Sequence, residues 1–126
     1  MGGEQKRGMR DAVERWMQHY ITAWTTNDPG DIRALFTEDA VYATSPQEAE
    51  PWRGRDDIVE HWLAGRDEPD DWTFEWKLLG VDGGRAFVQG LTTYRGNSRS
   101  YDNLWVIQLT ADGRASSFTE WYMQRK

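Results

Sequence analysis

The chain has 126 residues, with 21 acidic and 15 basic side chains, so its formal net charge is −6 at neutral pH. A chain of this length forms one domain and buries roughly two-thirds of its unfolded surface. Its negative charge repels phosphate backbones, which argues against nucleic acid as a partner, and the lack of cysteine excludes disulfides, thiolate metal sites and cysteine nucleophiles.

The chain is rich in aromatic residues, with eight Trp, five Tyr and four Phe. Trp and Tyr combine a large apolar face with one polar atom, so many of them together suit a ligand pocket or an interface as well as a core. No apolar run approaches the ~20 residues of a membrane span, and the opening MGGEQKRG lacks the hydrophobic segment of a signal peptide. We therefore expect a cytoplasmic protein with a disordered tail at residues 1–8 and one domain at residues 9–126.

Three helices are predicted in the first half of the chain. Apolar residues recur at helical spacing between residues 9 and 26, on a face formed by Val13, Trp16, Met17, Tyr20, Ile21, Ala23 and Trp24. Asp28 is placed to cap a second helix, expected at residues 29–36, with Pro29 in its first position. A third helix is predicted at residues 55–64.

The segment between the second and third helices is expected to hold a strand and a loop. The strand begins at Ala40, with Tyr42 and Thr44 on one side of it. Residues 45–52 carry no period and read as a loop, in which Trp52 is placed like a flap. On the third helix we expect His61 and Trp62 to share one face.

From Trp72 onward the apolar residues alternate with polar ones, which is typical of strands. Glycine-rich turns separate four strands. The first is expected to begin at residue 72, and the other three are expected to span residues 86–95, 100–110 and 115–123. Because short connections join antiparallel neighbours, these strands form a meander. The sequence thus predicts an α+β domain with its helices on one face of a sheet.

Three phrases in the sequence are similar to a known family. They are Tyr20…Trp24…Asn27-Asp28…Ile32…Leu35-Phe36…Asp39-Ala40-Val41-Tyr42, then Gly54-Arg55-Asp56-Asp57-Ile58, and finally Asp112-Gly113-Arg114…Phe118-Thr119-Glu120-Trp121. Their order and spacing resemble the nuclear transport factor 2-like superfamily in its SnoaL-like branch. The resemblance implies a cone-shaped roll, with three N-terminal helices packed on a strongly curved antiparallel sheet around a deep pocket, commonly in a homodimer. It implies no particular activity, because the superfamily holds isomerases, cyclases, dehydratases, epoxide hydrolases and non-enzymes.

Strand alternation, anchored on this resemblance, predicts which side chains face the pocket. The expected inward set on the strands is Tyr42, Thr44, Trp72, Phe74, Phe87, Gln89, Leu91, Thr93, Asn103, Trp105, Ile107, Phe118, Glu120 and Tyr122. The helices and the loop add Trp16, Tyr20, Trp24, Trp52, His61 and Trp62. The stripe that begins with Trp72 and Phe74 also fits a plain core, since alternating aromatics are common in sheets.

The ketosteroid isomerases of this fold use an aspartate base with a tyrosine and a protonated aspartate as oxyanion donors. Here the tyrosine position corresponds to Tyr20, whereas the base falls at Thr44 or Ser45 and the second acid falls near Trp105. A hydroxyl is a poor base and an indole only donates, so the isomerase mechanism does not carry over. The epoxide hydrolase and dehydratase residue sets have no counterpart either.

Glu120 is the remaining candidate for acid or base chemistry. Between Phe118 and Tyr122 on the last strand, its carboxylate would be desolvated and its pKa raised, which suits a general acid or base. The alternatives are that Glu120 lines the pocket without reacting, or only accepts structural hydrogen bonds. His61 could pair with Glu120 or serve structure alone, and the histidine spacing indicates no metal site.

Two functions remain open on this evidence. The first is a small-molecule binding protein or enzyme that holds a planar hydrophobic ligand between Trp and Tyr rings, with cofactor-independent cyclase, isomerase or lyase chemistry at Glu120, assisted by Tyr20, Gln89 or Asn103. The second is a non-catalytic domain whose aromatic side chains fill the cone. In either case an outer sheet face is expected to form a homodimer through Val88, Thr92, Tyr94, Leu104, Val106 and Gln108. A cavity of ~300 Å³ or more around Glu120 favours the first.

Overall fold

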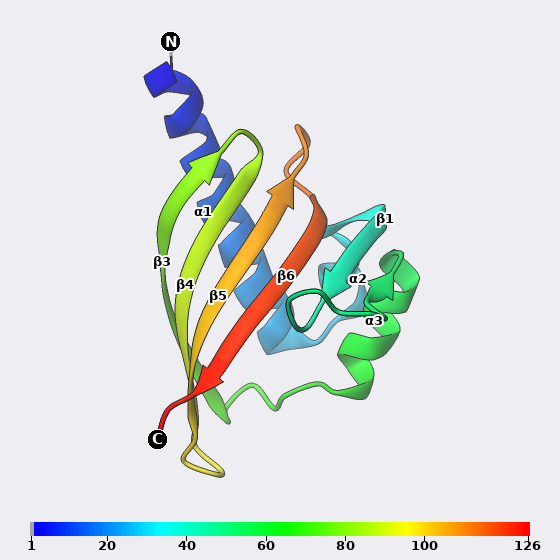
Figure 1. Ribbon diagram of the computed structural model, residues 1–126. Helices are drawn as coiled ribbons and strands as arrows, with labels where there is room; N and C mark the ends of the chain where they lie inside the picture. Colours follow the sequence, from blue (N-terminus) through cyan, green and yellow to red (C-terminus); the bar gives the residue numbers. More distant parts are fainter. Residues whose placement is uncertain (1) are drawn as a thin grey trace.

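The computed structural model describes the backbone of residues 2–126 and the side chains of residues 7–126. It confirms an α+β roll, with three helices on one face of a curved, unclosed sheet (Figure 1). The helices are α1 (Gly2–Thr26), α2 (Pro29–Arg33) and α3 (Arg55–Ala64). The strands are β1 (Phe36–Ala43), β2 (Trp52–Arg53), β3 (Trp72–Asp82), β4 (Arg85–Tyr94), β5 (Ser100–Leu109) and β6 (Ala115–Gln124).

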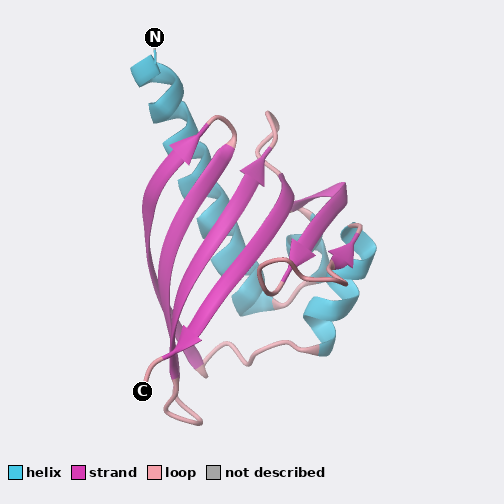
Figure 2. Ribbon diagram, in the orientation of Figure 1, coloured by secondary structure: helices cyan, strands magenta, loops and turns pink. Residues whose placement is uncertain are grey.

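The sheet has the strand order β2-β1-β6-β5-β4-β3. The four long strands form the predicted antiparallel meander, and their boundaries lie within one residue of those expected. One pairing is parallel, because β1 runs alongside β6 with Tyr42 opposite Phe118. α1 crosses one face of the meander, while α2 and α3 lie near β1 (Figure 2). The helices thus cover the concave face and leave the convex face bare.

Two helix boundaries differ from the sequence prediction. α1 begins at Gly2, within the segment for which we expected a disordered tail. Residues 4–7 are Glu, Gln, Lys and Arg, which favour helix, and the single Gly8 does not interrupt it. α2 ends at Arg33 instead of residue 36, because the chain enters β1 at Phe36. None of the described helices is long and apolar enough to cross a membrane.

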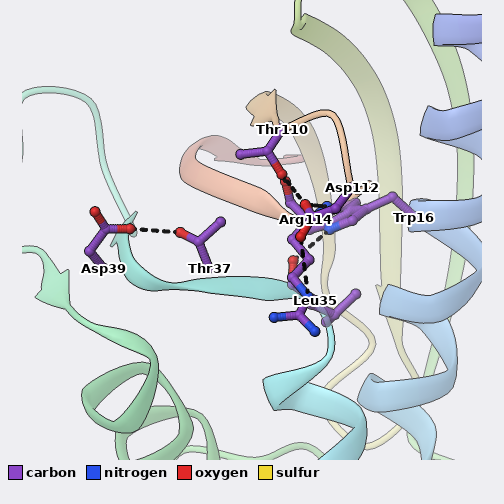
Figure 3. Close-up of polar contacts among 7 residues, drawn as sticks. All are labelled: Trp16, Leu35, Thr37, Asp39, Thr110, Asp112 and Arg114. Atoms are coloured by element: carbon purple, nitrogen blue, oxygen red, sulfur yellow. Dashed lines mark hydrogen bonds and ion pairs between the residues drawn. The ribbon is translucent and has the colours of Figure 1, made fainter.

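The carbonyl of Leu35 explains why the second helix stops early. It accepts a hydrogen bond from Trp16 Nε1 on α1 at 3.0 Å and another from the backbone N–H of Ala115 on β6 at 2.8 Å (Figure 3). The Thr110 hydroxyl bonds Asp112 and the Arg114 carbonyl, which closes the turn just before β6. These bonds tie α1, β1 and β6 together near the β5–β6 turn.

The buried face of α1 agrees with the prediction. Val13, Met17 and Ala23 are fully buried, and Trp16 and Tyr20 are nearly so. In front of them the sheet contributes Trp105, Ile107 and Phe118 to the same core. The helical spacing therefore identified the residues on which the sheet closes.

The predicted facing of β4 was wrong by one residue. Val88 pairs with Trp105 and is buried on the concave side, so Phe87, Gln89, Leu91 and Thr93 point to the convex side. The expected outward residues Val88, Thr92 and Tyr94 consequently face inward, whereas Leu104, Val106 and Gln108 do lie on the convex side.

Space on the concave face is the physical reason for this facing. A Cβ built on Gly90 would lie 2.5 Å from Cε1 of Phe74. The Phe74 ring is itself stacked on Trp105 with centroids 4.9 Å apart, and it lies 5.4 Å from the Trp24 ring. Small residues at alternate positions of β4 make room for these rings, so the larger Phe87 and Leu91 take the other face.

The contact of Gly90 with Phe74 is testable by a Gly90→Ala substitution. The added methyl group forces the Phe74 ring out of its stack, and we expect a loss of about 1–3 kcal/mol in the free energy of unfolding, measured by urea denaturation. Gly80→Ala is the matched control, because no atom lies within 4 Å of a Cβ at that strand position. Equal losses in the two variants would contradict this account of β4.

Candidate functional site

A cavity of about 540 Å³ opens where α1 ends and the sheet curves away from it. Its walls come from α1, β1, β2, α3, the connector at residues 65–71 and the three strands β4 to β6. Because no element supplies more than a few of the lining residues, the cavity exists only in the folded chain.

The cavity brings together many of the residues that the sequence placed in a pocket. These are Tyr20, Trp24, Tyr42, Trp52, His61, Trp62, Asn103, Trp105, Glu120 and Tyr122. Other expected residues lie elsewhere. Trp16 and Phe118 belong to the core beneath the cavity, Trp72 and Phe74 form a second layer behind its wall, Thr44 lies beyond the end of β1, and Phe87 and Gln89 are on the opposite face of the sheet.

Ring stacking holds the cavity wall in place. Trp24 stacks on Trp72 with centroids 3.8 Å apart and planes 12° from parallel. Trp52 belongs to β2 and stacks on Tyr42 at 4.7 Å and on His61 at 5.0 Å. The expected flap residue is therefore a fixed part of the wall.

The indole N–H groups of Trp24, Trp62 and Trp105 are also engaged. Trp24 Nε1 donates to Asp67 Oδ2 at 3.1 Å, and Trp62 Nε1 donates to Asn27 Oδ1 at 3.0 Å. Trp105 Nε1 donates to Glu120 Oε2 at 2.7 Å. Buried indoles need such partners, and here the partners also fix the ring positions before any ligand arrives.

Tyr20 and Tyr42 meet inside the cavity, with 2.8 Å between their hydroxyl oxygens. Only one of the two hydroxyl hydrogens can lie between the oxygens, so the other remains available to donate. Burial raises the pKa of both phenols far above the ordinary range, and the nearby Glu120 carboxylate raises it further. Both groups are therefore neutral donors at physiological pH.

Glu120 lies on the concave face of β6, directly opposite Trp105 on β5. Its Oε2 accepts hydrogen bonds from Trp105 Nε1 at 2.7 Å and from Asn103 Nδ2 at 3.1 Å. Asn103 is oriented in turn by the Thr92 hydroxyl, which donates to Asn103 Oδ1 at 2.8 Å. Within the described part of the chain, Oε1 accepts no hydrogen bond, so one carboxylate oxygen stays available to the cavity.

Burial raises the pKa of Glu120, although the hydrogen bonds from Trp105 and Asn103 oppose the shift. A carboxyl group with a raised pKa can exchange a proton closer to neutral pH than an exposed one. His61 does not complete a pair with it, because its Nε2 lies 3.3 Å from Asp57 on the same helix. The local chemistry available is proton transfer by Glu120 near a neutral phenol donor.

The sequence prediction missed the rim of the cavity. Asp67 is its key residue, since Oδ2 accepts from Trp24 Nε1 and from the Tyr94 hydroxyl, each at 3.1 Å. The Asp67 carbonyl also accepts from Asn27 Nδ2 at 3.1 Å. The missed lining residues are Gly65, Arg66, Asp67, Asp71, Thr92, Tyr94, Asn97 and Tyr101. The connector shows no periodic pattern from which its position could be predicted. Thr92 and Tyr94 were missed because the facing of β4 was predicted wrongly.

Comparison with known proteins places the whole arrangement in one family. A family model described as a SnoaL-like domain matches residues 17–118. No curated protein matches the sequence.

Solved structures with the same fold differ widely from this chain in sequence. A provisionally assigned ketosteroid isomerase from Kribbella flavida DSM 17836 has a TM-score of 0.70 and 20% identity, over 92% of this chain and 81% of that one. An NTF-2 like protein of unknown function from Burkholderia xenovorans LB400 has a TM-score of 0.72 and 14% identity, over 93% and 87%. SalBIII, an epoxide hydrolase/cyclase-like enzyme in pyran ring formation in the polyether salinomycin, has a TM-score of 0.70 and 18% identity, over 93% and 92%. At such identities the likeness concerns the fold alone.

The raised pKa of Glu120 leads to a prediction about stability. Because its pKa is raised, Glu120 holds its proton more tightly in the folded state than in the unfolded chain. Above about pH 4.3, where the unfolded chain releases this proton, the contribution of Glu120 to the free energy of unfolding falls as pH rises. Glu120→Gln cannot titrate and loses this dependence. We expect the stability of the wild-type protein relative to this variant to decrease with rising pH until Glu120 is ionised in the folded state, measured by urea denaturation across that range. A relative stability that rises with pH would contradict the raised pKa.

Proposed function

The chain belongs to the SnoaL-like domain family, and we propose that it binds a small hydrophobic molecule in the aromatic cavity around Glu120. The single observation that carries this proposal is an open cavity of about 540 Å³ at that carboxylate. This volume is typical of small-molecule sites. The alternative of a cone filled by its own aromatic side chains leaves no room for such a cavity.

The lining supports a ligand with a flat apolar body. Trp24, Trp52 and Trp62 supply ring surface from three different elements, and their stacking or hydrogen-bonding partners fix their positions. Such a wall needs little reordering when a ligand binds, which favours affinity. A planar or polycyclic compound matches this shape better than a flexible chain.

Acid or base catalysis at Glu120 is the second part of the proposal. Glu120 would donate or accept a proton through Oε1, while Asn103 and Trp105 hold Oε2 and so orient the carboxylate. The Tyr20 and Tyr42 pair would stabilise negative charge that develops on a ligand oxygen. Gln89, on the convex face, has no part in this mechanism, and both functional groups of the Asn103 amide are already engaged within the protein.

The bare convex face supports a homodimer. Phe87, Leu91, Leu104 and Val106 are partly buried there, and Trp121 and Met123 at its edge are 39% and 71% exposed. An apolar surface of this kind on a monomer is typical of an interface. Because the ligand cavity lies on the other face of the same sheet, the two surfaces do not compete.

Ligand binding is tested with N-phenyl-1-naphthylamine, an uncharged hydrophobic probe. We expect saturable enhancement of its fluorescence with quenching of tryptophan emission, and about tenfold weaker binding in Trp52→Ala, which removes part of the wall. Trp121→Ala removes an indole from the convex face and serves as the matched control, with unchanged affinity. The proposal fails if the wild-type protein shows no saturable binding.

The dimer is tested with Leu104→Glu, which places a charge in the middle of the convex face. A buried unpaired charge is costly, so we expect the variant to be monomeric where the wild-type protein is dimeric, as measured by sedimentation velocity. Ala111→Glu adds the same charge at an exposed turn and should leave the dimer intact. A monomeric wild-type protein would rule out this interface.

A further inference from the structure

The carboxylates that have an ion-pair partner among the described residues all lie outside the cavity lining. Arg or His side chains lie against Asp56, Asp57, Asp102 and Asp112, all outside the cavity lining. In contrast, the cavity-lining carboxylates Glu120, Asp67 and Asp71 form no ion pair with any described residue. The cavity therefore holds negative charge that the protein itself leaves uncompensated.

Neutral donors hold these carboxylates in place without cancelling their charge. Asp67 accepts from an indole and a phenol, and Asp71 Oδ1 accepts from the backbone N–H of Gly96 at 2.7 Å. Glu120 accepts from an indole and an amide on one oxygen only. Arg66 in the lining is exposed at the rim and forms no ion pair with a described residue, and His61 Nε2 lies 3.3 Å from Asp57 Oδ1.

The aromatic wall favours the same sign of ligand charge. Ring faces carry negative electrostatic potential, so Trp and Tyr rings attract cations, most strongly where water is excluded. The cavity that holds Glu120 gathers rings from several elements, among them Tyr20 on α1, Tyr42 on β1, Trp62 on α3 and Tyr122 on β6. A ligand with a negative group would meet ring faces and carboxylates together and would lose hydration, with the neutral hydroxyl of the Tyr20–Tyr42 pair as its donor inside the cavity.

We propose that the ligand of this cavity carries a protonated amine, which pairs with Glu120 Oε1 while its apolar body lies against the indole rings. This inference rests on the proposed ligand-binding function and names the chemical class of the ligand. It gives the free oxygen of Glu120 a partner and gives the negative cavity its counter-charge. Burial makes the isolated Glu120 carboxylate unfavourable, and an ammonium group beside it offsets that cost.

Three probes of nearly equal shape separate charge from hydrophobicity. They are 1-naphthylmethylamine, 1-naphthylmethanol and 1-naphthoate, titrated calorimetrically into the wild-type protein at neutral pH. We expect the amine to bind about tenfold tighter than the alcohol, and the carboxylate to bind most weakly. In Glu120→Gln the preference for the amine over the alcohol should disappear. Asp102→Asn removes a carboxylate from the convex face of the same sheet and should retain the preference.

A measurement on the wild-type protein keeps the test valid if Glu120→Gln does not fold. Where the raised pKa leaves Glu120 partly protonated in the folded protein, the amine should displace that proton, whereas the alcohol should not, and titrations at stepwise lower pH in two buffers of different ionisation enthalpy report it. Equal affinity for amine and alcohol, or tightest binding of the carboxylate, would overturn this inference and leave the hydrophobic cavity standing. No binding of any probe would overturn both proposals.

Discussion

The packing of the aromatic face of α1 against the concave side of the sheet is the constraint on which the rest of this structure depends. The ring centroid of Tyr20 lies 4.7 Å from that of Trp105 and 5.7 Å from that of Phe118, and one helical turn later Trp24 stacks on Trp72. Rings of this size need space. The sheet provides it by its curvature and by Gly90, which pairs with Trp76 and lies against the Phe74 ring. The bulky residues of β4 are consequently displaced to the convex face.

This constraint also decides where the cavity lies. Near the β5–β6 turn the Leu35 carbonyl ties α1, β1 and β6 together. At the other end α1 stops at Thr26, and Asp67 of the connector accepts hydrogen bonds from Trp24 on α1 and from Tyr94 on β4. The space left between them is lined by aromatic rings, several of which have their polar atoms engaged within the protein, together with the Glu120 carboxylate. A wall fixed in this way favours a ligand of defined shape.

The same fold serves proteins with different chemistry, so the local residues must decide the function. By the resemblance, the isomerase base position corresponds to Thr44 or Ser45 and the second acid position falls near Trp105, whose N–H donates to Glu120. The two phenols are neutral, and the cavity-lining carboxylates form no ion pair with a described residue. These features support the proposals of proton transfer by Glu120 and of a cationic ligand group, and they differ from the isomerase arrangement.

The sequence by itself determined the class of fold, the element boundaries of the meander and the buried face of α1, because helical period, alternation and turn residues are local signals. It also indicated that Glu120 lies among rings. The tertiary structure alone decided the facing of β4, because both faces of that strand carry apolar residues and only the crowding of Phe74 at Gly90 distinguishes them. It also decided the parallel pairing of β1 with β6 and the rim at Asp67, since an aperiodic connector takes its position from distant partners such as Tyr94.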